Sequence, residues 1–373
     1  MFALETFISL ELQRAWLNRP TCILLGVVLG LLMIANLAVL ILKRQPEGNI
    51  NAAMLRRFDL RLRAWWMMCV ILIAGFLLRY VGTVVLFWAV SFWALREFVT
   101  MTPTRRGDHR ALFWVFFVFT PLQYVLVGLG HELYGLYSIV IPVYGSLFIP
   151  ARIAMSGDHK RFLERSAKIS VGLLICVYAL SYAPALLDLE LLTEKPAPVS
   201  GSLSTEEGMD SSSAPTEDGD TQEASASNGK RNLRPWNGSN AGLLFFLVLI
   251  VQLSDVFQYV WGRLLGHRVI APEINASRTW EGFIGGVATT TIVGTLLWWA
   301  TPFLLWQAAC MSLIIAIMAF AGGMTMSAVK RDRGVADTGT LVQGHAGVLD
   351  RIDSICFAAP VFFHLTRYFF SAI

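Results

Sequence analysis

Long apolar stretches with few charges recur along most of the chain, and short segments between them hold most of the charged residues. Because about 20 apolar residues in a helix cross the hydrocarbon core of a bilayer, each stretch predicts a membrane-spanning helix. We predict about ten, over residues 21–42, 64–79, 81–98, 111–129, 133–151, 169–187, 241–261, 282–300, 302–326 and 355–372. The pattern therefore predicts an all-α, polytopic integral membrane protein.

The basic residues of the short loops favour ten helices over nine. A hairpin at 79–82 separates the second helix from the third, and one long segment in their place would invert the first helix relative to the rest. Lys and Arg concentrate in cytoplasmic loops. With ten helices, the basic loops after the first, third and fifth helices lie on one side, together with segments 262–281 and 327–354. Both termini then lie on the opposite side.

Composition supports this prediction and isolates one different segment. The chain is 55% hydrophobic and 15% charged, against about 45–50% and about 25% in soluble domains, and its net charge of +4 does not indicate nucleic-acid binding. Residues 193–240 are acidic and rich in Ser, Ala, Gly and Pro, so they cannot bury enough apolar surface to offset the entropy of ordering. We predict a disordered, non-cytoplasmic linker, or alternatively a binding tail, between membrane regions 1–192 and 241–373.

A first polar cluster begins inside the predicted helix 241–261, near its cytoplasmic end. A carboxylate at the bilayer centre costs about 2.5–3.5 kcal/mol, so Asp255 should face a cavity, a partner or a metal ion. Tyr259 lies four residues later and shares its helix face. Gly262 and Gly266 repeat this spacing and either admit a ligand or allow close packing of helices.

A second cluster, over residues 327–353, combines both signs of charge. It holds four basic side chains (Lys330, Arg331, Arg333, Arg351), four aspartates (Asp332, Asp337, Asp350, Asp353) and His345. Lys and Arg bind phosphates, and several carboxylates with one His and no Cys favour Mg²⁺ over zinc. The mixture predicts phosphoryl or nucleotidyl transfer at a membrane surface. The alternative is an ordinary basic cytoplasmic loop.

These residues resemble a known family. The second cluster is similar to the signature of the CDP-diacylglycerol synthases, or phosphatidate cytidylyltransferases, which combines S-x-x-K-R, K-D, H-G-G and D-R-x-D. The matching residues are Ser327, Lys330, Arg331, Asp337, His345, Gly347, Asp350, Arg351 and Asp353. Upstream, D-x-x-A/Q-Y-x-x-G-K/R and S-P-x-K-T-W-E-G resemble this chain at Asp255, Tyr259, Gly262, Arg263, Thr279, Trp280, Glu281 and Gly282. The resemblance covers roughly residues 250–354.

The chain departs from the family pattern at several positions. Ala336 replaces the usual Lys, which would weaken phosphate binding unless Arg333 compensates. Ala346 replaces the first Gly after the His, and Gln343 replaces a usual Pro or Gly. In the upstream element, Asn and Ala at 275–276 replace Ser-Pro, whereas Arg278 keeps the positive charge of the usual Lys.

The resemblance implies that CTP and phosphatidate react to CDP-diacylglycerol and pyrophosphate, with Mg²⁺ as cofactor. It implies metal ligands at Asp337 and Asp255, followed by Asp350 and Asp353. It implies catalytic roles for Lys330, Arg331, His345, Arg351 and Glu281. Of these, Lys330 and Arg331 would hold phosphates. Glu281 and His345 would orient the site. Substrate contacts fall to Tyr259, Arg263, Arg278, Ser327, Gly344 and Gly347.

Three other functions remain open at this point. The chain could use CTP with another lipid phosphate or a polyprenol, or it could be an inactive homologue, for which Ala336 and Ala346 are the motivation. A transporter is disfavoured because its coupling charges would lie near the bilayer midplane and its halves often repeat, whereas these charges gather at one interface. We expect a bacterial inner membrane, a cytoplasmic active site and, as a further hypothesis, a homodimer.

Overall fold

The computed structural model describes residues 79–101, 104–194, 234–236, 238–335 and 347–371, together with scattered positions between 22 and 73. The first two predicted helices, 21–42 and 64–79, therefore lie largely outside the described residues. The linker interior and residues 336–346 also lie outside them, and the latter range contains Asp337, Gly344 and His345.

The N-terminal half of the described chain forms four long helical segments. The first is α4 (Arg79–Met101), and each of the other three contains a π-helical turn. After η1 (Arg106–Asp108), the second segment consists of α5 (His109–Trp114), η2 (Val115–Phe119) and α6 (Thr120–Gly128). The third consists of η3 (His131–Leu133), α7 (Tyr134–Ile139), η4 (Val140–Gly145) and α8 (Ser146–Ala154). The fourth consists of α9 (Phe162–Leu173), η5 (Leu174–Ala179), α10 (Leu180–Ala185) and η6 (Leu186–Asp188).

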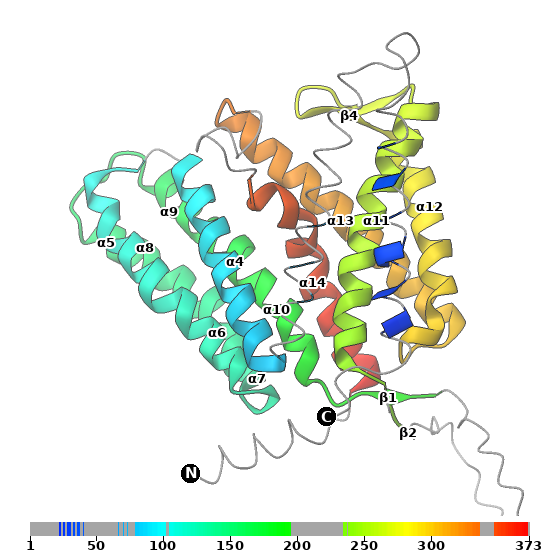
Figure 1. Cartoon of the computed structure of the whole chain (residues 1–373). Helices are drawn as coiled ribbons and strands as arrows, with labels where there is room; N and C mark the ends of the chain where they lie inside the picture. The colour runs from blue at the N-terminus through cyan, green and yellow to red at the C-terminus, as the bar shows by residue number, and fades with distance from the viewer. Residues whose placement is uncertain are drawn as a thin grey trace, which may run out of the picture.

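The C-terminal half places four helices side by side. They are α11 (Asn240–Leu265), α12 (Trp280–Leu296), α13 (Leu305–Asp332) and α14 (Leu349–Phe370), with η7 (Trp298–Ala300) after α12. Helix α11 packs against α12 and α13, and α13 packs against α14. Helix α14 also contacts α4 and α10, so it lies at the junction of the two halves (Figure 1).

Within the described residues, six helical segments are long and apolar enough to cross a membrane: Arg79–Met101, His109–Gly128, His131–Ala154, Phe162–Asp188, Asn240–Leu265 and Leu305–Asp332. The predicted number of about ten is not confirmed. Large apolar side chains point outward from several helices, including Phe117, Leu147 and Leu296, which are 62%, 69% and 66% exposed. Such surfaces suit lipid contact, because exposed apolar patches of this kind mark interaction or membrane surfaces.

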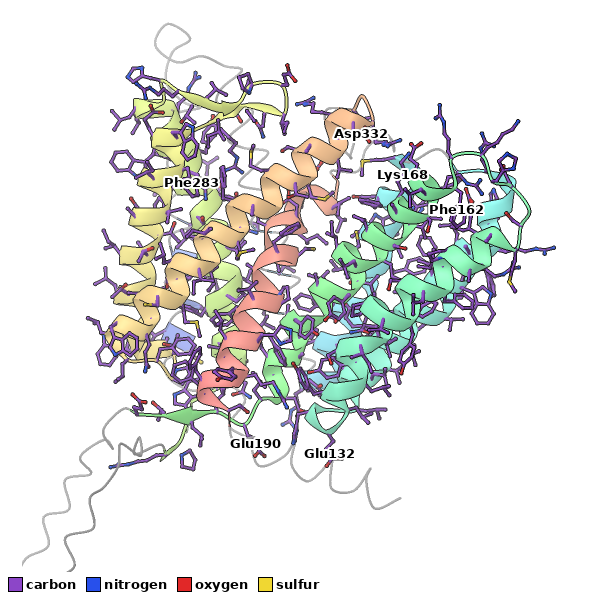
Figure 2. All side chains as sticks on the ribbon, turned by 180° about the vertical axis from the view of Figure 1, so that it is seen from behind. Glu132, Phe162, Lys168, Glu190, Phe283 and Asp332 are labelled. Atoms are coloured by element: carbon purple, nitrogen blue, oxygen red, sulfur yellow. The ribbon has the colours of Figure 1, made fainter. Side chains whose placement is uncertain are left out.

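The described parts of the basic loops gather at one end of the helices, as predicted. This end holds η1, residues 155–161, the hairpin between α11 and α12, and the end of α13 (Figure 1). Lys168 and Asp332 lie at this end, whereas Glu132 and Glu190 lie at the opposite end (Figure 2). The Arg333 guanidinium of one half lies 3.7 Å from the Glu164 carboxylate of the other, which joins the two halves here.

Two short sheets add to the all-α architecture that the sequence predicted. Strand β1 (Leu192–Thr193) pairs antiparallel with β2 (Arg234–Pro235), and the Thr193 hydroxyl donates to the Pro302 carbonyl at 2.7 Å. Both ends of the predicted linker 193–240 are therefore ordered, and the disorder of its interior stays a prediction. The second sheet is the hairpin of β3 (Val269–Ala271) and β4 (Asn275–Thr279).

Glycines allow α11 and α12 to approach closely. A Cβ atom on Gly282 would lie 2.9 Å from the Gly262 Cα, and one on Gly266, just after α11, would lie 2.7 Å from the hydroxyl oxygen of Thr279, which precedes α12. A Cβ atom on Gly286 would lie 2.7 Å from the Cα of Gln258. The glycines at 262 and 266 thus serve close backbone packing, which was the alternative to ligand contact.

Gly286→Ala is expected to destabilise the protein, because the added methyl group meets the backbone of α11 and forces α12 outward. Overpacking of this kind costs about 1–3 kcal/mol. The measurement is the thermal unfolding midpoint in detergent, with Gly135→Ala as the control. Gly135 is also helical, but no neighbouring atom lies within 4 Å of its added Cβ. Equal midpoints for the two variants would contradict the close packing of α11 on α12.

Candidate active site

Asp255 lies where α11, the β3–β4 hairpin and α14 meet. Its Oδ1 pairs with Arg278 Nη2 at 3.0 Å, and its Oδ2 accepts a hydrogen bond from the Ser354 hydroxyl at 2.8 Å. Arg278 Nη1 donates to Gln258 Oε1 at 2.7 Å. The Asp255 carboxylate therefore faces a cation and a hydroxyl, in agreement with the expectation that a carboxylate in this helix needs a partner.

The surroundings of Arg278 hold its guanidinium in place. A Cβ atom on Gly323 of α13 would lie 3.3 Å from Nη2, so glycine leaves room for the guanidinium at that position. The guanidinium carbon lies 6.0 Å from the centre of the Phe320 ring, within the range of a cation–π contact. Gln258 is itself fixed by donating to the Ser254 hydroxyl at 2.8 Å.

The β3–β4 hairpin brings Arg278 to this place. Thr279 caps α12 by accepting from the Gly282 amide at 3.1 Å. The Glu281 carboxylate accepts from the amides of His267 and Arg268, each at 3.2 Å. Glu281 thus fixes the base of the hairpin, and its carboxylate binds backbone amides there.

Asp353 joins Asp255 at the Ser354 hydroxyl. Ser354 Oγ lies 2.8 Å from Asp255 Oδ2 and 3.3 Å from Asp353 Oδ1, so two carboxylates from different helices meet at one hydroxyl group. Nearby, Lys330 of α13 forms an ion pair with Asp350 of α14, with Nζ 2.9 Å from Oδ1, and both side chains are largely shielded from solvent. The charges of Lys330 and Asp350 also act on Asp353.

The end of α13 is attached to the hairpin. Arg331 Nε donates to the Ile274 carbonyl at 3.1 Å. The side-chain amide of Asn275 donates through Nδ2 to the Ser327 hydroxyl at 3.2 Å. Asn275 Oδ1 also accepts from the Ser277 amide at 3.1 Å. Asn275, which departs from the family pattern, therefore links the hairpin to α13.

The structure does not bring every predicted site residue to this cluster. Tyr259 and Arg263 lie on the last turns of α11 with exposed side chains, four residues apart. Arg351 is half-buried in the first turn of α14, and Gly347 is buried just before it. Asp337, Gly344 and His345, with Ala336 and Ala346, lie outside the described residues, so their predicted roles stay predictions.

The predicted metal ligands are only partly assembled within the described residues. No group of three or more His, Cys, Asp or Glu side chains there is arranged to hold a metal ion. Asp255 and Asp353 come together, whereas Asp350 pairs with Lys330. The donors present are carboxylate and hydroxyl oxygens, which suit Mg²⁺ better than zinc.

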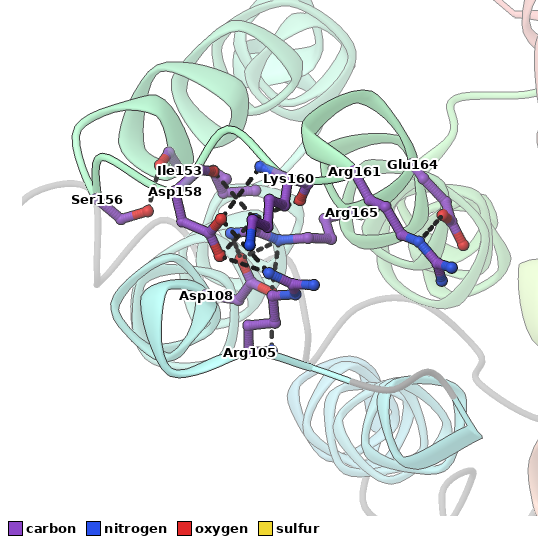
Figure 3. Close-up of polar contacts among 9 residues, drawn as sticks. All are labelled: Arg105, Asp108, Ile153, Ser156, Asp158, Lys160, Arg161, Glu164 and Arg165. Atoms are coloured by element: carbon purple, nitrogen blue, oxygen red, sulfur yellow. Dashed lines mark hydrogen bonds and ion pairs between the residues drawn. The ribbon is translucent and has the colours of Figure 1, made fainter.

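A second polar cluster lies at the same end of the N-terminal helices (Figure 1), and Figure 3 shows its contacts. The buried Arg165 pairs with Asp108 at 2.5 Å and with Asp158 at 3.1 Å, and Arg105 also lies 3.1 Å from Asp158. The hydrogen bond from the Lys160 amide and the one from Arg105 lower the pKa of the Asp158 carboxyl. This cluster connects η1 and α9 with the loop between α8 and α9.

Arg333 is engaged by two carboxylates, those of Asp332 and of Glu164. At the turn that follows α13, the backbone of Gly334 has a φ of +70°, which favours glycine. Arg333 is the residue expected to compensate for the Lys that Ala336 replaces in the family pattern. In this structure its guanidinium is already paired with these carboxylates.

Three residues that shape the site were not among the predicted site residues: Gln258, Ser354 and Glu97. Gln258 occupies the A/Q position of the upstream family element, which was a signal for it, whereas nothing in the sequence distinguishes the uncharged Ser354 from other polar residues of helices. Glu97 was detectable, because it is a carboxylate within the predicted span 81–98, and such residues are rarely without a function. Its carboxylate accepts hydrogen bonds from the Val348 and Leu349 amides at the start of α14.

Comparison with known proteins places these residues in a family context. The sequence model of the cytidylyltransferase family matches residues 59–369. An uncharacterized protein of Escherichia coli (strain K12), YnbB, is 34% identical over 316 residues, which is 83% of this chain and 87% of that protein.

Phosphatidate cytidylyltransferases match a shorter part of the chain. The Mycobacterium leprae protein is 37% identical over 125 residues and the Synechocystis protein is 38% identical over 116 residues. These alignments cover 32% and 31% of this chain, and 39% of each relative. The family match itself spans α4 to α14, including the helices that carry Asp255 and Asp353. The chain therefore belongs to the cytidylyltransferase family.

Proposed function

We propose that this protein is a membrane nucleotidyltransferase that condenses CTP with phosphatidate to give CDP-diacylglycerol and pyrophosphate in phospholipid synthesis. The observation that carries the proposal is the cluster in which Asp255, Arg278, Asp353 and Ser354 meet, beside the Lys330–Asp350 pair. Family membership and the partial similarity to phosphatidate cytidylyltransferases support it.

The reaction needs positioning and charge stabilisation rather than a strong base. A phosphate oxygen of phosphatidate attacks the α-phosphorus of CTP, the bond from this phosphorus to the oxygen that leads to the β-phosphate breaks, and pyrophosphate leaves. The attacking phosphate is already ionised near neutral pH. Catalysis of such transfers comes from alignment of the reactants and stabilisation of negative charge.

The described residues suit these tasks. Arg278, Lys330 and Arg331 would bind phosphate groups, with Arg278 and Lys330 exchanging their present carboxylate partners for substrate oxygens. Asp255 and Asp353, with Asp337 and Asp350, would hold Mg²⁺. Bound Mg²⁺ would neutralise charge on the triphosphate.

The position of the cluster near one end of the helices fits one water-soluble and one lipid substrate. The cluster is built from the C-terminal half of α11, strand β4 and the first turns of α14. These parts lie toward the end of the helices that carries the basic loops (Figure 1), and basic loops are typically cytoplasmic. A site there would meet CTP from the cytosol and phosphatidate from the bilayer. We therefore propose a bacterial inner membrane location with the site on the cytoplasmic side. The homodimer stays a prediction.

An acceptor panel tests the substrate. The detergent-purified protein would receive radiolabelled CTP and Mg²⁺ with phosphatidate, with a polyprenyl phosphate, or with no lipid, and the labelled lipid products would be separated. We expect product with phosphatidate above all. Preference for the polyprenyl phosphate would favour the alternative acceptor, and no product with either lipid would favour an inactive homologue.

Ala336→Lys is expected to lower the KM for CTP or to leave it unchanged, because it restores the cation that the family usually places there. Ala336→Gln is the control, since it adds a polar side chain without the charge. The measurement is the initial rate at varied CTP with fixed phosphatidate. A clear rise in KM for the Lys variant alone would show that this loop is built differently from that of the family.

A further inference from the structure

Glu97 connects the N-terminal helices to the start of α14. It lies in α4, and the residue is only 8% exposed. Its Oε1 accepts from the Val348 amide at 3.0 Å, and its Oε2 accepts from the Leu349 amide at 2.8 Å. One carboxylate from a distant part of the sequence thus binds two consecutive amides where α14 begins.

These amides need an acceptor that α14 itself does not provide. The first N–H groups of a helix have no intrahelical partner, and the residue at the N-cap position is Val348, whose side chain cannot accept a hydrogen bond. A negative charge at a helix N-terminus is also stabilised by the helix dipole. Glu97 therefore acts as the N-terminal cap of α14.

The capped turn carries the candidate site. Asp350 and Arg351 lie in the first turn of α14, and Asp353 and Ser354 follow directly. Lys330 binds Asp350, and Asp255 binds Ser354. The negative charge of Glu97 also acts on Arg351. A shift of the start of α14 would therefore move side chains that we assign to substrate and metal binding.

The two hydrogen bonds of Glu97 offset the cost of burying its carboxylate at this place. Burying a carboxylate is costly unless it is hydrogen-bonded, and α14 is also held along its length by packing against α13 and α10. The carboxylate adds a specific constraint on the position and direction of the first turn, where small displacements matter most for catalysis.

We propose that Glu97 is a positioning residue for cytidylyl transfer, which holds the first turns of α14 so that Asp353 and Ser354 meet Asp255. This inference rests on the proposed function. Glu97 touches neither substrate in this proposal and acts through the backbone of α14.

The test compares Glu97→Ala and Glu97→Gln with Ser91→Ala. Ser91 is buried in the same helix and forms a hydrogen bond with the Tyr124 hydroxyl at 2.5 Å, but this contact does not involve α14. The readouts are kcat and KM for both substrates, the Mg²⁺ concentration for half-maximal rate, and hydrogen exchange of peptides that cover residues 347–355.

We expect Glu97→Ala to lower kcat about 10- to 100-fold, the range that a small misplacement of reacting groups produces. The Mg²⁺ concentration for half-maximal rate should rise, and the α14 amides should exchange faster. Glu97→Gln should recover part of kcat, because its single amide oxygen can accept from one of the two N–H groups. Ser91→Ala should leave the Mg²⁺ dependence unchanged.

Normal kcat and Mg²⁺ dependence in folded Glu97→Ala would overturn the proposal, as would a loss of activity that only follows the folded fraction. If Glu97→Ala does not fold, Glu97→Gln provides the same comparison, and normal values there overturn it equally. Absence of turnover in the wild type would instead contradict the proposed function. The exchange of the α14 amides still reports on the cap in that case, so the two failures are distinguishable.

Discussion

Asp255→Asn is expected to abolish CDP-diacylglycerol formation while leaving the protein folded. The substitution keeps the size of the side chain but removes the negative charge that pairs with Arg278 and that we assign to metal binding. Asn could still accept a hydrogen bond from Ser354, so the local packing should persist. The Arg278 side chain, 20% exposed, would lose its carboxylate partner but would still donate to Gln258, so we expect a lower unfolding midpoint with the folded state retained.

The measurement is the rate of CDP-diacylglycerol formation with the thermal unfolding midpoint recorded alongside. Asp332→Asn is the matched control, because Asp332 is a carboxylate at the same end of the helices but is 66% exposed and outside the Asp255 cluster. Normal turnover by Asp255→Asn would remove Asp255 from the chemistry. A loss of turnover equal to that of Asp332→Asn would show a general effect of charge at this surface.

Asp337→Ala is also expected to abolish turnover without unfolding the protein. Asp337 matches the aspartate of the K-D element of the family signature by position, and we propose it as a metal ligand in addition to Asp255 and Asp353. Any ligand that binds the folded state alone raises the unfolding midpoint. Mg²⁺ with CTP should therefore raise the midpoint of the wild type and have a smaller effect on Asp337→Ala. Retention of normal activity would contradict the metal assignment.

The individual site residues were more predictable than their partners. A carboxylate in an apolar helix identifies Asp255 from the sequence, because its burial is costly without a partner. The partner, Arg278, depends on the β3–β4 hairpin, which the apolar pattern did not predict because strands this short leave little periodicity. The contribution of Ser354 depends on how α14 packs against α11, which no local pattern encodes.

The two aspartates of α14 show the same limit. The family resemblance, through its D-R-x-D element, implied both Asp350 and Asp353 as metal ligands, and in the structure the two lie three residues apart on α14. Their partners in the structure differ, because Lys330 pairs with Asp350, whereas Asp353 shares the Ser354 hydroxyl with Asp255. Which carboxylate pairs with which cation is decided by the packing of α13 on α14.

The helix boundaries were predictable where local signals exist. The predicted start of the last helix was residue 355, whereas α14 begins at Leu349. The first turn of α14 is polar, so a prediction based on apolar residues treats it as a loop. Its N-terminal cap is Glu97 in another helix rather than a neighbouring Ser, Thr, Asp or Asn. The start of α12 at Trp280 is close to the predicted 282, and there the cap is local, at Thr279.

The most direct test of the central claim is the formation of CDP-diacylglycerol by the detergent-purified protein supplied with CTP, phosphatidate and Mg²⁺. We expect CDP-diacylglycerol and pyrophosphate to appear in equal amounts, and the formation of both to depend on Mg²⁺. A folded protein that forms neither product under these conditions would contradict the proposed function.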